Sequence, residues 1–221
     1  MLTVGTILTN RVRVLLRDID EGGVQWRDPE LIQWFNEACA EIARVRPESC
    51  SSTESFALAA GSKQSVVSTG ASRVLEVICN LVDGEEGRAV RRVERSTLDN
   101  EDPDWMAGTK TKTVFRYSAS LTDPRSFFVY PPSDGTGSLL MVIGTTPDEV
   151  VELTDAFPLP SMYAACVANY VLFRAFAKFT ESEAMQTRAS GYYNLFTSQI
   201  SDTQSSMEQD NAVTRDRNGA K

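Results

Sequence analysis

The sequence predicts an α+β protein in which an N-terminal and a C-terminal αα-hairpin form a four-helix bundle, with an antiparallel β module, a small barrel or sandwich, inserted between them. Two observations lead to this fold class. Apolar side chains recur at helical spacing in residues 1–50 and 151–200, whereas residues 51–150 contain short β-branched and aromatic runs separated by Gly, Pro, Asn and Asp. Residues 201–221 are polar. We therefore expect a helical hairpin, a β domain, a second hairpin that completes the bundle, and a C-terminal arm.

The first predicted helix has both of its ends marked. Thr3 is suited to cap the first turn, and Gly22-Gly23 provides a flexible stop. The apolar stripe consists of Val4, Leu8, Val12, Leu15, Leu16 and Ile19. Together with the helix that follows, it is expected to form an αα-hairpin over residues 1 to about 47.

The second predicted helix carries more apolar surface than one neighbour needs. Asp28 is a good N-cap, Pro29 suits the first helical position, and Pro47 ends the segment. One face consists of Leu31, Trp34, Phe35, Ala38, Ile42 and Val45, and a flank consists of Ile32, Cys39 and Ala43. Together they cover roughly half of the circumference. We expect the face to fill the bundle core and the flank to contact a second helix or an adjacent subunit.

The middle of the chain reads as strands and turns. The candidate strands are residues 54–58, 64–68, 72–82, 89–95, 112–120, 126–132 and 138–146. A short helical turn is expected at residues 96–105, and a turn at Asp134-Gly135. Several short strands at this spacing favour a small antiparallel barrel or sandwich.

The C-terminal part returns to helical spacing. Residues 158–179 are apolar almost all round, which predicts a helix buried on several sides. A membrane span is disfavoured because Asn169, Arg174 and Lys178 interrupt this segment. Thr180 and Glu183 form a capping box. The helix that it starts has the apolar residues Met185, Ala189, Tyr192, Tyr193, Phe196 and Ile200. Residues 201–221 are too polar to fold alone, so we expect a mobile tail or an arm that a partner orders.

Composition excludes several classes of function. The chain has no histidine, which rules out Ser-His-Asp and Cys-His catalysis and imidazole metal sites. Its net charge of -8 at pH 7 argues against tight wrapping of nucleic acid. The four cysteines have no paired spacing, so neither a zinc site nor a disulfide framework is expected. The N-terminus lacks the pattern of a secretion signal. No cofactor is expected.

Three clusters could carry chemistry, and each has a simpler interpretation. The acidic run Asp99, Glu101, Asp102 and Asp104 could attract a hard cation, but it lacks the glycine and the distal glutamate of a calcium loop, so a solvated turn is favoured. The run Arg88, Arg91, Arg92 and Arg95 is interleaved with glutamates, which favours a salt-bridged strand surface, with a subunit interface next. Glu37 and Glu41 lie one helical turn apart, and a solvated or subunit-facing surface is favoured over acid-base catalysis. We expect no enzyme.

The order of several segments along the chain resembles a known family. The segments are WRDPELIQWFNEACAEIARVRPES, LAAGSKQSV, RVLEVICN, LDNEDPDW, DPRSFFVYPPSDGTGSL and YVLFRAFAKFTESEAMQTRASGYYNLF. In this order and spacing they resemble the head-to-tail adaptor, or connector, proteins of tailed bacteriophages, which are related in role to tail tubular protein A. The resemblance extends to about residue 200.

The resemblance implies a structural protein of the virion neck or tail that is assembled in the host cytoplasm. Its partners would be further copies in a ring, usually of 12, the portal protein above the ring, and a tail or nozzle protein below it. Genomic DNA would pass through the ring without sequence-specific binding, and no membrane is involved. An acidic chain suits such a channel because it repels DNA. The alternatives are another tail ring component, a stopper or terminator, and less readily a metal-dependent hydrolase that uses residues 99–104.

Two sets of residues follow from this interpretation. The expected subunit or bundle interface consists of Ile32, Trp34, Phe35, Cys39, Ala43, Tyr170 and Phe173. The expected portal-binding set consists of Tyr192, Tyr193, Phe196, Met207, Val213, Arg215 and Arg217. The aromatic members of both sets could also be core residues, since they recur at helical spacing.

Overall fold

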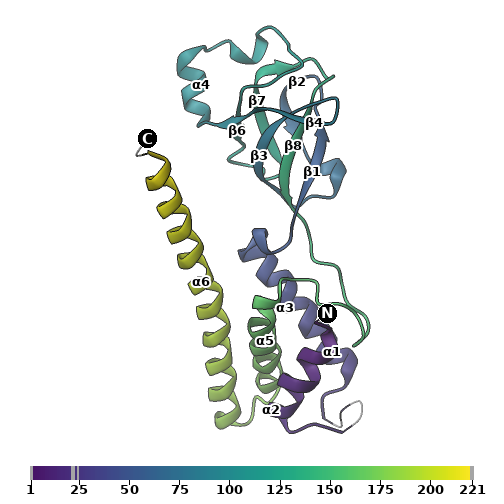
Figure 1. The fold of residues 1–221 in the computed structure, drawn as a ribbon. Helices are drawn as coiled ribbons and strands as arrows, with labels where there is room; N and C mark the ends of the chain where they lie inside the picture. Colours follow the sequence, from purple (N-terminus) through teal and green to yellow (C-terminus); the bar gives the residue numbers. More distant parts are fainter. Residues whose placement is uncertain (1, 21–22, 24, 220–221) are drawn as a thin grey trace. The chain divides into compact units, whose positions relative to one another are not determined.

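The computed structural model describes residues 2–20, 23 and 25–219, with side chains up to residue 201 in the last helix. The α+β class is confirmed, because the chain combines helices with two four-stranded sheets. It divides into two compact units (Figure 1). Met1–Ser49 and Pro147–Lys221 form the helical unit, and Cys50–Thr146 form the β unit. The four-helix bundle and the barrel or sandwich stay predictions.

The first helical segment is continuous but changes its winding. It consists of α1 (Val4–Ile7), a π-helix η1 (Leu8–Arg13) and α2 (Val14–Leu16). The Thr3 hydroxyl caps it by accepting a hydrogen bond from the Thr6 amide at 3.3 Å. The expected stop at Gly22-Gly23 comes later than the observed one, because Arg17 adopts the left-handed conformation and ends α2.

Helix α3 (Asp28–Val45) begins one residue earlier than its capping signal predicts. Arg27 is the N-cap residue, and Asp28 is the first helical residue. The physical reason is that the Asp28 carboxylate forms an ion pair with the Arg13 guanidinium instead of capping its own helix. A short 3-10 turn, η2 (Pro47–Ser49), follows the helix.

Helix α5 (Ala164–Ala177) is the centre of the helical unit. A 3-10 turn, η5 (Ser161–Tyr163), precedes it, and the helix packs against η1, α3 and α6 (Figure 1). Aromatic pairs fasten it to α6: Tyr170 and Phe196 lie 5.0 Å apart between ring centroids. Helix α6 (Glu183–Gly219) continues without interruption across residue 201, where the sequence predicts that a separate arm begins.

The β unit contains two sheets with one shared core. One sheet has the order β1-β8-β3-β4, and the other has the order β2-β7-β6-β5. The strands of the first are β1 (Ser51–Ala57), β8 (Ser138–Gly144), β3 (Arg73–Val82) and β4 (Glu85–Ala89). Those of the second are β2 (Gly61–Ser65), β7 (Ser126–Ser133), β6 (Arg116–Ala119) and β5 (Arg91–Arg92). Their buried side chains, including Met141 from the first sheet and Phe127 from the second, form one apolar cluster. A 3-10 turn, η3 (Val67–Thr69), follows β2.

The predicted strand at residues 89–95 is divided between the two sheets. The chain leaves the first sheet at Ala89, the end of β4, and joins the second sheet as β5, where it pairs in parallel with β6. This parallel pairing makes the second sheet mixed, whereas the sequence predicts an antiparallel module. Val90, between the two strands, is buried in the core that the two sheets share. The expected helical turn is α4 (Arg95–Glu101) with η4 (Trp105–Ala107).

Candidate subunit and partner interfaces

The residues expected at a subunit or bundle interface are largely used inside this chain. Ile32, Trp34, Phe35 and Cys39 are buried within the helical unit, while Ala43, Tyr170 and Phe173 are half-buried. The first four therefore serve the core of their own unit. Only the last three keep surface that another protein can touch.

The residues expected to bind portal also differ from one another in how far they are buried. Phe196 is buried against Tyr170, and Tyr192 stacks on Phe176 at 5.6 Å between ring centroids. Tyr193 contacts Phe173 and stays 45% exposed. The side chains of Met207, Val213, Arg215 and Arg217 lie outside the described part of the chain.

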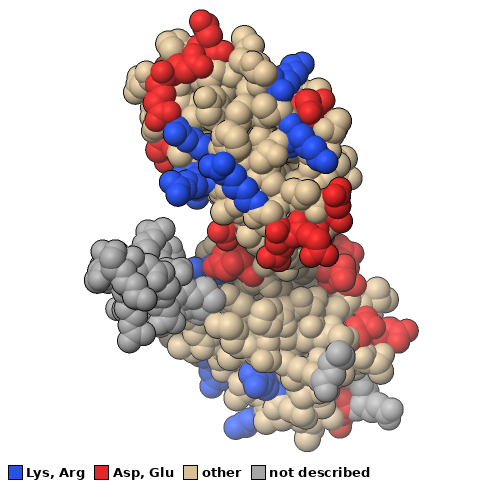
Figure 2. Space-filling model, turned by 45° about the horizontal axis from the view of Figure 1, so that its top comes forward, with Lys and Arg blue, Asp and Glu red and all other residues tan. Residues whose placement is uncertain are grey.

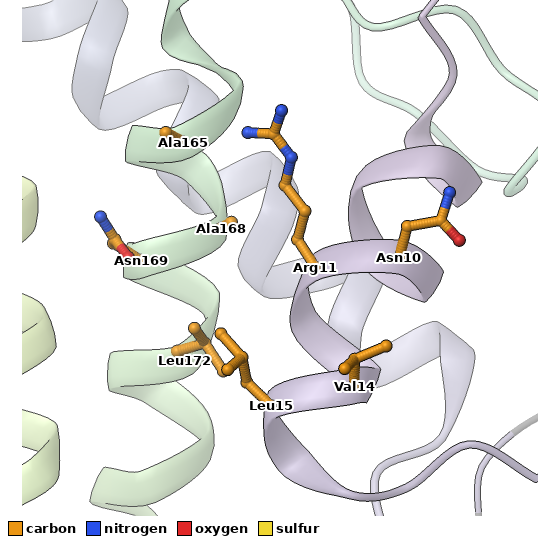
Figure 3. Close-up of a pocket in the computed structure, with 8 residues that line it drawn as sticks. All are labelled: Asn10, Arg11, Val14, Leu15, Ala165, Ala168, Asn169 and Leu172. Atoms are coloured by element: carbon orange, nitrogen blue, oxygen red, sulfur yellow. The ribbon is translucent and has the colours of Figure 1, made fainter.

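A groove between the first helical segment and α5 is a surface that sequence reasoning missed. It has a volume of about 360 Å³. Its lining residues are Asn10, Arg11, Val14, Leu15, Ala165, Ala168, Asn169 and Leu172. Figure 3 shows Leu15 and Leu172 pointing into it from its two walls, with Arg11 extended along it. The small Ala165 and Ala168 side chains leave the space open on the α5 side.

The π-helix explains why this groove is apolar and open. The sequence predicts Leu15 and Ile19 in the core stripe, but Leu15 is 54% exposed and Ile19 is 75% exposed. A π-helix has more residues per turn than an α-helix, so the stripe shifts around the helix after η1. Val14 and Leu15 thereby face outward beside the groove. π-Helices are frequent at functional sites, which makes this face a candidate for contact with another protein.

The same π-helix places a charge inside the helical unit. Arg13 is buried and forms ion pairs with Asp18, at 3.2 Å, and with Asp28. The Asp18 carboxylate also accepts hydrogen bonds from the amides of Gln25 and Trp26. This network ties the end of the first helical segment to the start of α3, so it fixes the hairpin that carries the groove.

Charged contacts also join α3 to the C-terminal helices. Glu37 pairs with Arg174, and Glu30 pairs with Lys178 at 2.7 Å. The buried Arg46 donates two hydrogen bonds to the Ile200 carbonyl of α6, at 2.6 and 3.2 Å. Each of these pairs connects residues more than 130 positions apart. They hold the two ends of the chain together in one unit.

The candidate acid-base pair on α3 has structural partners instead. Glu37 is bound to Arg174, as above, and Glu41 accepts two hydrogen bonds from Arg44. The hydrogen bond from Arg44 holds the pKa of the Glu41 carboxyl below its usual value. A lowered carboxyl pKa is unsuited to a general acid near neutral pH.

The candidate metal cluster in the β unit is likewise occupied by protein contacts. The Asp99 carboxylate accepts a hydrogen bond from Trp105 Nε1 at 2.8 Å and pairs with Arg95 at 3.6 Å, and Glu101 pairs with Arg116. In the described residues no group of three or more His, Cys, Asp or Glu side chains could hold a metal ion. Asp99 therefore joins α4 to η4, and Glu101 joins α4 to β6 of the second sheet.

The arginine run of the β unit is only partly salt-bridged. Arg95 pairs with Asp99, as expected. Arg88, Arg91 and Arg92 are exposed and form no ion pair with any residue that the structure describes. We call these three residues the arginine edge. Figure 2 shows Lys and Arg side chains gathered within one face of the β unit, with Asp and Glu side chains along its margin.

These features define a protein that acts through its surfaces, with a helical unit, a β unit and several open faces. The chain matches the family model described as SU10 adaptor protein over residues 2–219, and it belongs to this family. No curated protein matches the chain. Family membership agrees with the resemblance to phage head-to-tail adaptors and indicates a structural virion component that contacts other head-tail proteins. Of the helices that the structure describes, none has the length and apolarity needed to cross a membrane.

Proposed function

We propose that this protein is a head-to-tail adaptor that forms a ring, of 12 copies, beneath the phage portal and connects the capsid to the tail. Genomic DNA passes through the ring without sequence-specific binding, and the ring assembles in the host cytoplasm. The observation that carries the proposal is the family match over residues 2–219. The acidic net charge of -8 supports a channel wall that does not hold DNA.

The helical unit offers the surface for lateral contact in this ring. Val14 and Leu15 expose aliphatic side chains along the groove, and covering apolar surface favours association. A ring requires a heterologous contact, in which one face of a copy meets a different face of the next. We therefore assign the groove face to a neighbouring copy.

A single substitution tests this assignment. Leu15→Glu places a charge on an exposed position, so the protein should stay folded while ring formation on purified portal falls strongly, as measured by native mass spectrometry. Leu121→Glu is the matched control, because Leu121 is 95% exposed in the β unit and lies outside the groove. Rings of normal yield from the Leu15→Glu protein would contradict the lateral contact.

The end of α6 is proposed to bind the portal. Helix α6 continues past Ile200, the last buried residue whose side chain the structure describes, and we assign this continuation to the portal. Deletion of residues 201–221 should leave a folded protein with unchanged thermal unfolding that no longer co-sediments with portal rings. Co-sedimentation equal to that of the full chain would remove this part of the proposal.

A further inference from the structure

The arginine edge lies where the β unit has two open strand edges. Arg88 is on β4, the last strand of the first sheet, and Arg91 and Arg92 form β5, the last strand of the second sheet. The chain passes directly from one to the other through the buried Val90. Three guanidinium groups therefore occur within five consecutive residues at one side of the module.

The backbone beneath these side chains is held firmly. The buried Asn80 amide donates to the carbonyls of Arg88, at 2.9 Å, and Val114, at 2.8 Å, and accepts from the Val114 amide. The Arg91 amide donates to the Phe115 carbonyl at 3.0 Å. A buried side chain and a strand ladder thus fix the positions from which the arginines project. A surface on fixed elements loses little conformational entropy when it binds.

One arginine is also oriented by an aromatic ring. The Arg88 guanidinium lies over the Phe115 ring, 4.4 Å from its centroid, and Phe115 is 37% exposed. A cation-π contact of this kind leaves the hydrogen-bond donors of the guanidinium free. The contrast with Arg95 and Arg116 is clear, since each of these pairs with a carboxylate on α4.

The pattern of charge on the same strands argues for a protein partner over DNA. Glu85, Glu86 and Glu94 are exposed and flank the arginine edge in sequence. A duplex presents an unbroken row of phosphates, which these carboxylates would repel. A folded protein can place its carboxylates against the arginines alone. The net charge of -8 adds a long-range repulsion between this chain and DNA.

The chain itself supplies suitable carboxylates. Asp102 and Asp104 are exposed between α4 and η4, and neither forms an ion pair among the described residues. The turn that holds them is ordered by a hydrogen bond from the Asp104 amide to the Asp102 carboxylate at 3.1 Å. They lie on a different element from the arginine edge, so pairing between copies joins two different sets of residues. This is the heterologous contact that a ring needs.

We propose that the arginine edge of one copy binds the Asp102 and Asp104 turn of the next copy in the ring. The inference rests on the proposed function, because the ring supplies the neighbour. It adds a polar contact between β units to the apolar contact assigned to the helical units. Charged pairs at such a boundary fix register and orientation more than they add affinity.

Zero-length cross-linking tests the contact directly. An Arg91→Lys/Arg92→Lys protein keeps the charge and provides amines that a carbodiimide joins to a touching carboxylate. A mixture of nitrogen-14 and nitrogen-15 copies, assembled on portal, should give mixed-isotope peptides that link position 91 or 92 to Asp102 or Asp104. Lys63, exposed on the opposite edge strand β2, is the internal control and should give no such link. Links to Glu85 or Glu86 alone would indicate a two-fold contact and overturn the proposal.

Charge-reversal variants test the proposed contact separately from ring formation. Arg91→Glu/Arg92→Glu and Asp102→Arg/Asp104→Arg should each lower ring yield by about tenfold or more, and a chain that carries all four substitutions should recover most of it. Lys63→Glu should leave the yield unchanged. If wild-type rings form and both reversed proteins assemble as well as wild type, the inference is wrong and the ring stands. If wild type forms no ring on portal, the proposed function fails, and mixed-isotope links in the concentrated free protein then decide the inference.

If the arginine edge instead serves DNA, a different result is expected. Binding of a 20-base-pair duplex to the full chain would then weaken on Arg91→Glu/Arg92→Glu, while ring yield stayed normal. That combination would also overturn the proposal. Duplex binding that is absent from wild type, together with the cross-links above, supports the contact between copies.

Discussion

The helical unit and the β unit use charged side chains in opposite ways. In the helical unit, Arg13 and Arg46 are buried and bind carboxylates or a helix carbonyl. In the β unit the core is apolar apart from satisfied polar groups such as the Asn80 amide, and the arginines lie at the surface. Buried charges are costly unless they are paired, so they fix one arrangement of the helices. Surface charges cost little and stay available for partners.

The difference follows from how each unit holds its helices or strands together. Strands satisfy one another's backbone groups through the ladder, and the same hydrogen bonds hold the segments of the β unit together. Helices satisfy their own backbone groups and leave their mutual placement to side chains. In the helical unit, aromatic pairs between α5 and α6 and the charged contacts to α3 perform this task. We therefore expect substitutions in the two units to have distinct consequences.

The largest effect is expected from Phe127→Ala, which empties the centre of the β core. Phe127 has no exposed surface, and its loss should lower the free energy of unfolding of the β unit by about 3–5 kcal/mol. Hydrogen exchange followed by mass spectrometry should show faster exchange in residues 50–146 and unchanged exchange in α3 and α5. Leu121→Ala is the control and should change little. Equal loss of protection in both units would show that they unfold together.

The second-largest effect is expected from Arg13→Met, which should destabilise the helical unit. It removes the cation that neutralises Asp18 and Asp28, so the buried Asp18 carboxylate loses its ion pair with Arg13. The expected loss is about 3 kcal/mol in chemical denaturation. Arg11→Met, on the same π-helix but exposed, should stay within about 0.5 kcal/mol of wild type. An Arg13→Met protein as stable as wild type would show that the buried pair is no more stabilising than an apolar contact.

Asn80→Ala should have a smaller effect, confined to the strands that carry the arginine edge. The Val114 amide, buried beside it, loses its partner, and an unsatisfied buried group costs about 1–3 kcal/mol. Exchange should accelerate in residues 85–92 and 111–116 before it does in β8. Asn100→Ala, at an exposed position of α4, is the matched control. Uniform acceleration over the whole β unit would contradict a local role for Asn80.

The smallest effect is expected from Asp155→Asn, and its effect on thermal stability should depend on pH. Hydrogen bonds from the amides of Glu152 and Val151 hold the pKa of the Asp155 carboxyl below its ordinary value of 3.8. A lowered folded-state pKa stabilises the fold above 3.8, and this contribution disappears as the pH falls through the folded-state pKa. The gap in thermal stability between wild type and Asp155→Asn should therefore be largest near neutral pH and close in acid. A gap that is constant with pH would exclude the charge as its cause.

Local signals in the sequence were sufficient for much of the fold. The Thr3 cap, the extent of α3 and the strands at residues 126–132 and 138–146 follow from side-chain type and spacing alone. So does the helical turn before Trp105. Each of these depends on interactions within a few residues, which is why pattern alone identifies them.

The candidate interfaces were harder to predict, because they depend on contacts between distant residues. The apolar stripe of the first helix assigned Leu15 and Ile19 to the core. Leu15 faces outward because it follows the π-helix, and Ile19 lies beyond Arg17, where the helical segment has ended. The arginine run was expected to form a salt-bridged strand surface, with a subunit interface as the next alternative, yet its carboxylate neighbours in sequence do not reach Arg91 or Arg92. Spacing along a strand does not tell which edge of which sheet a residue will occupy.

By itself, the sequence determined the α+β class, the absence of histidine chemistry and the resemblance to phage adaptors, because composition, period and the order of segments are properties of the chain. The tertiary structure decided which apolar and charged side chains stay free. It buried Ile32 and Cys39 within the helical unit, opened the groove at Leu15 and left the arginine edge without ion pairs to the described residues. The physical reason is that exposure depends on which distant segments pack together.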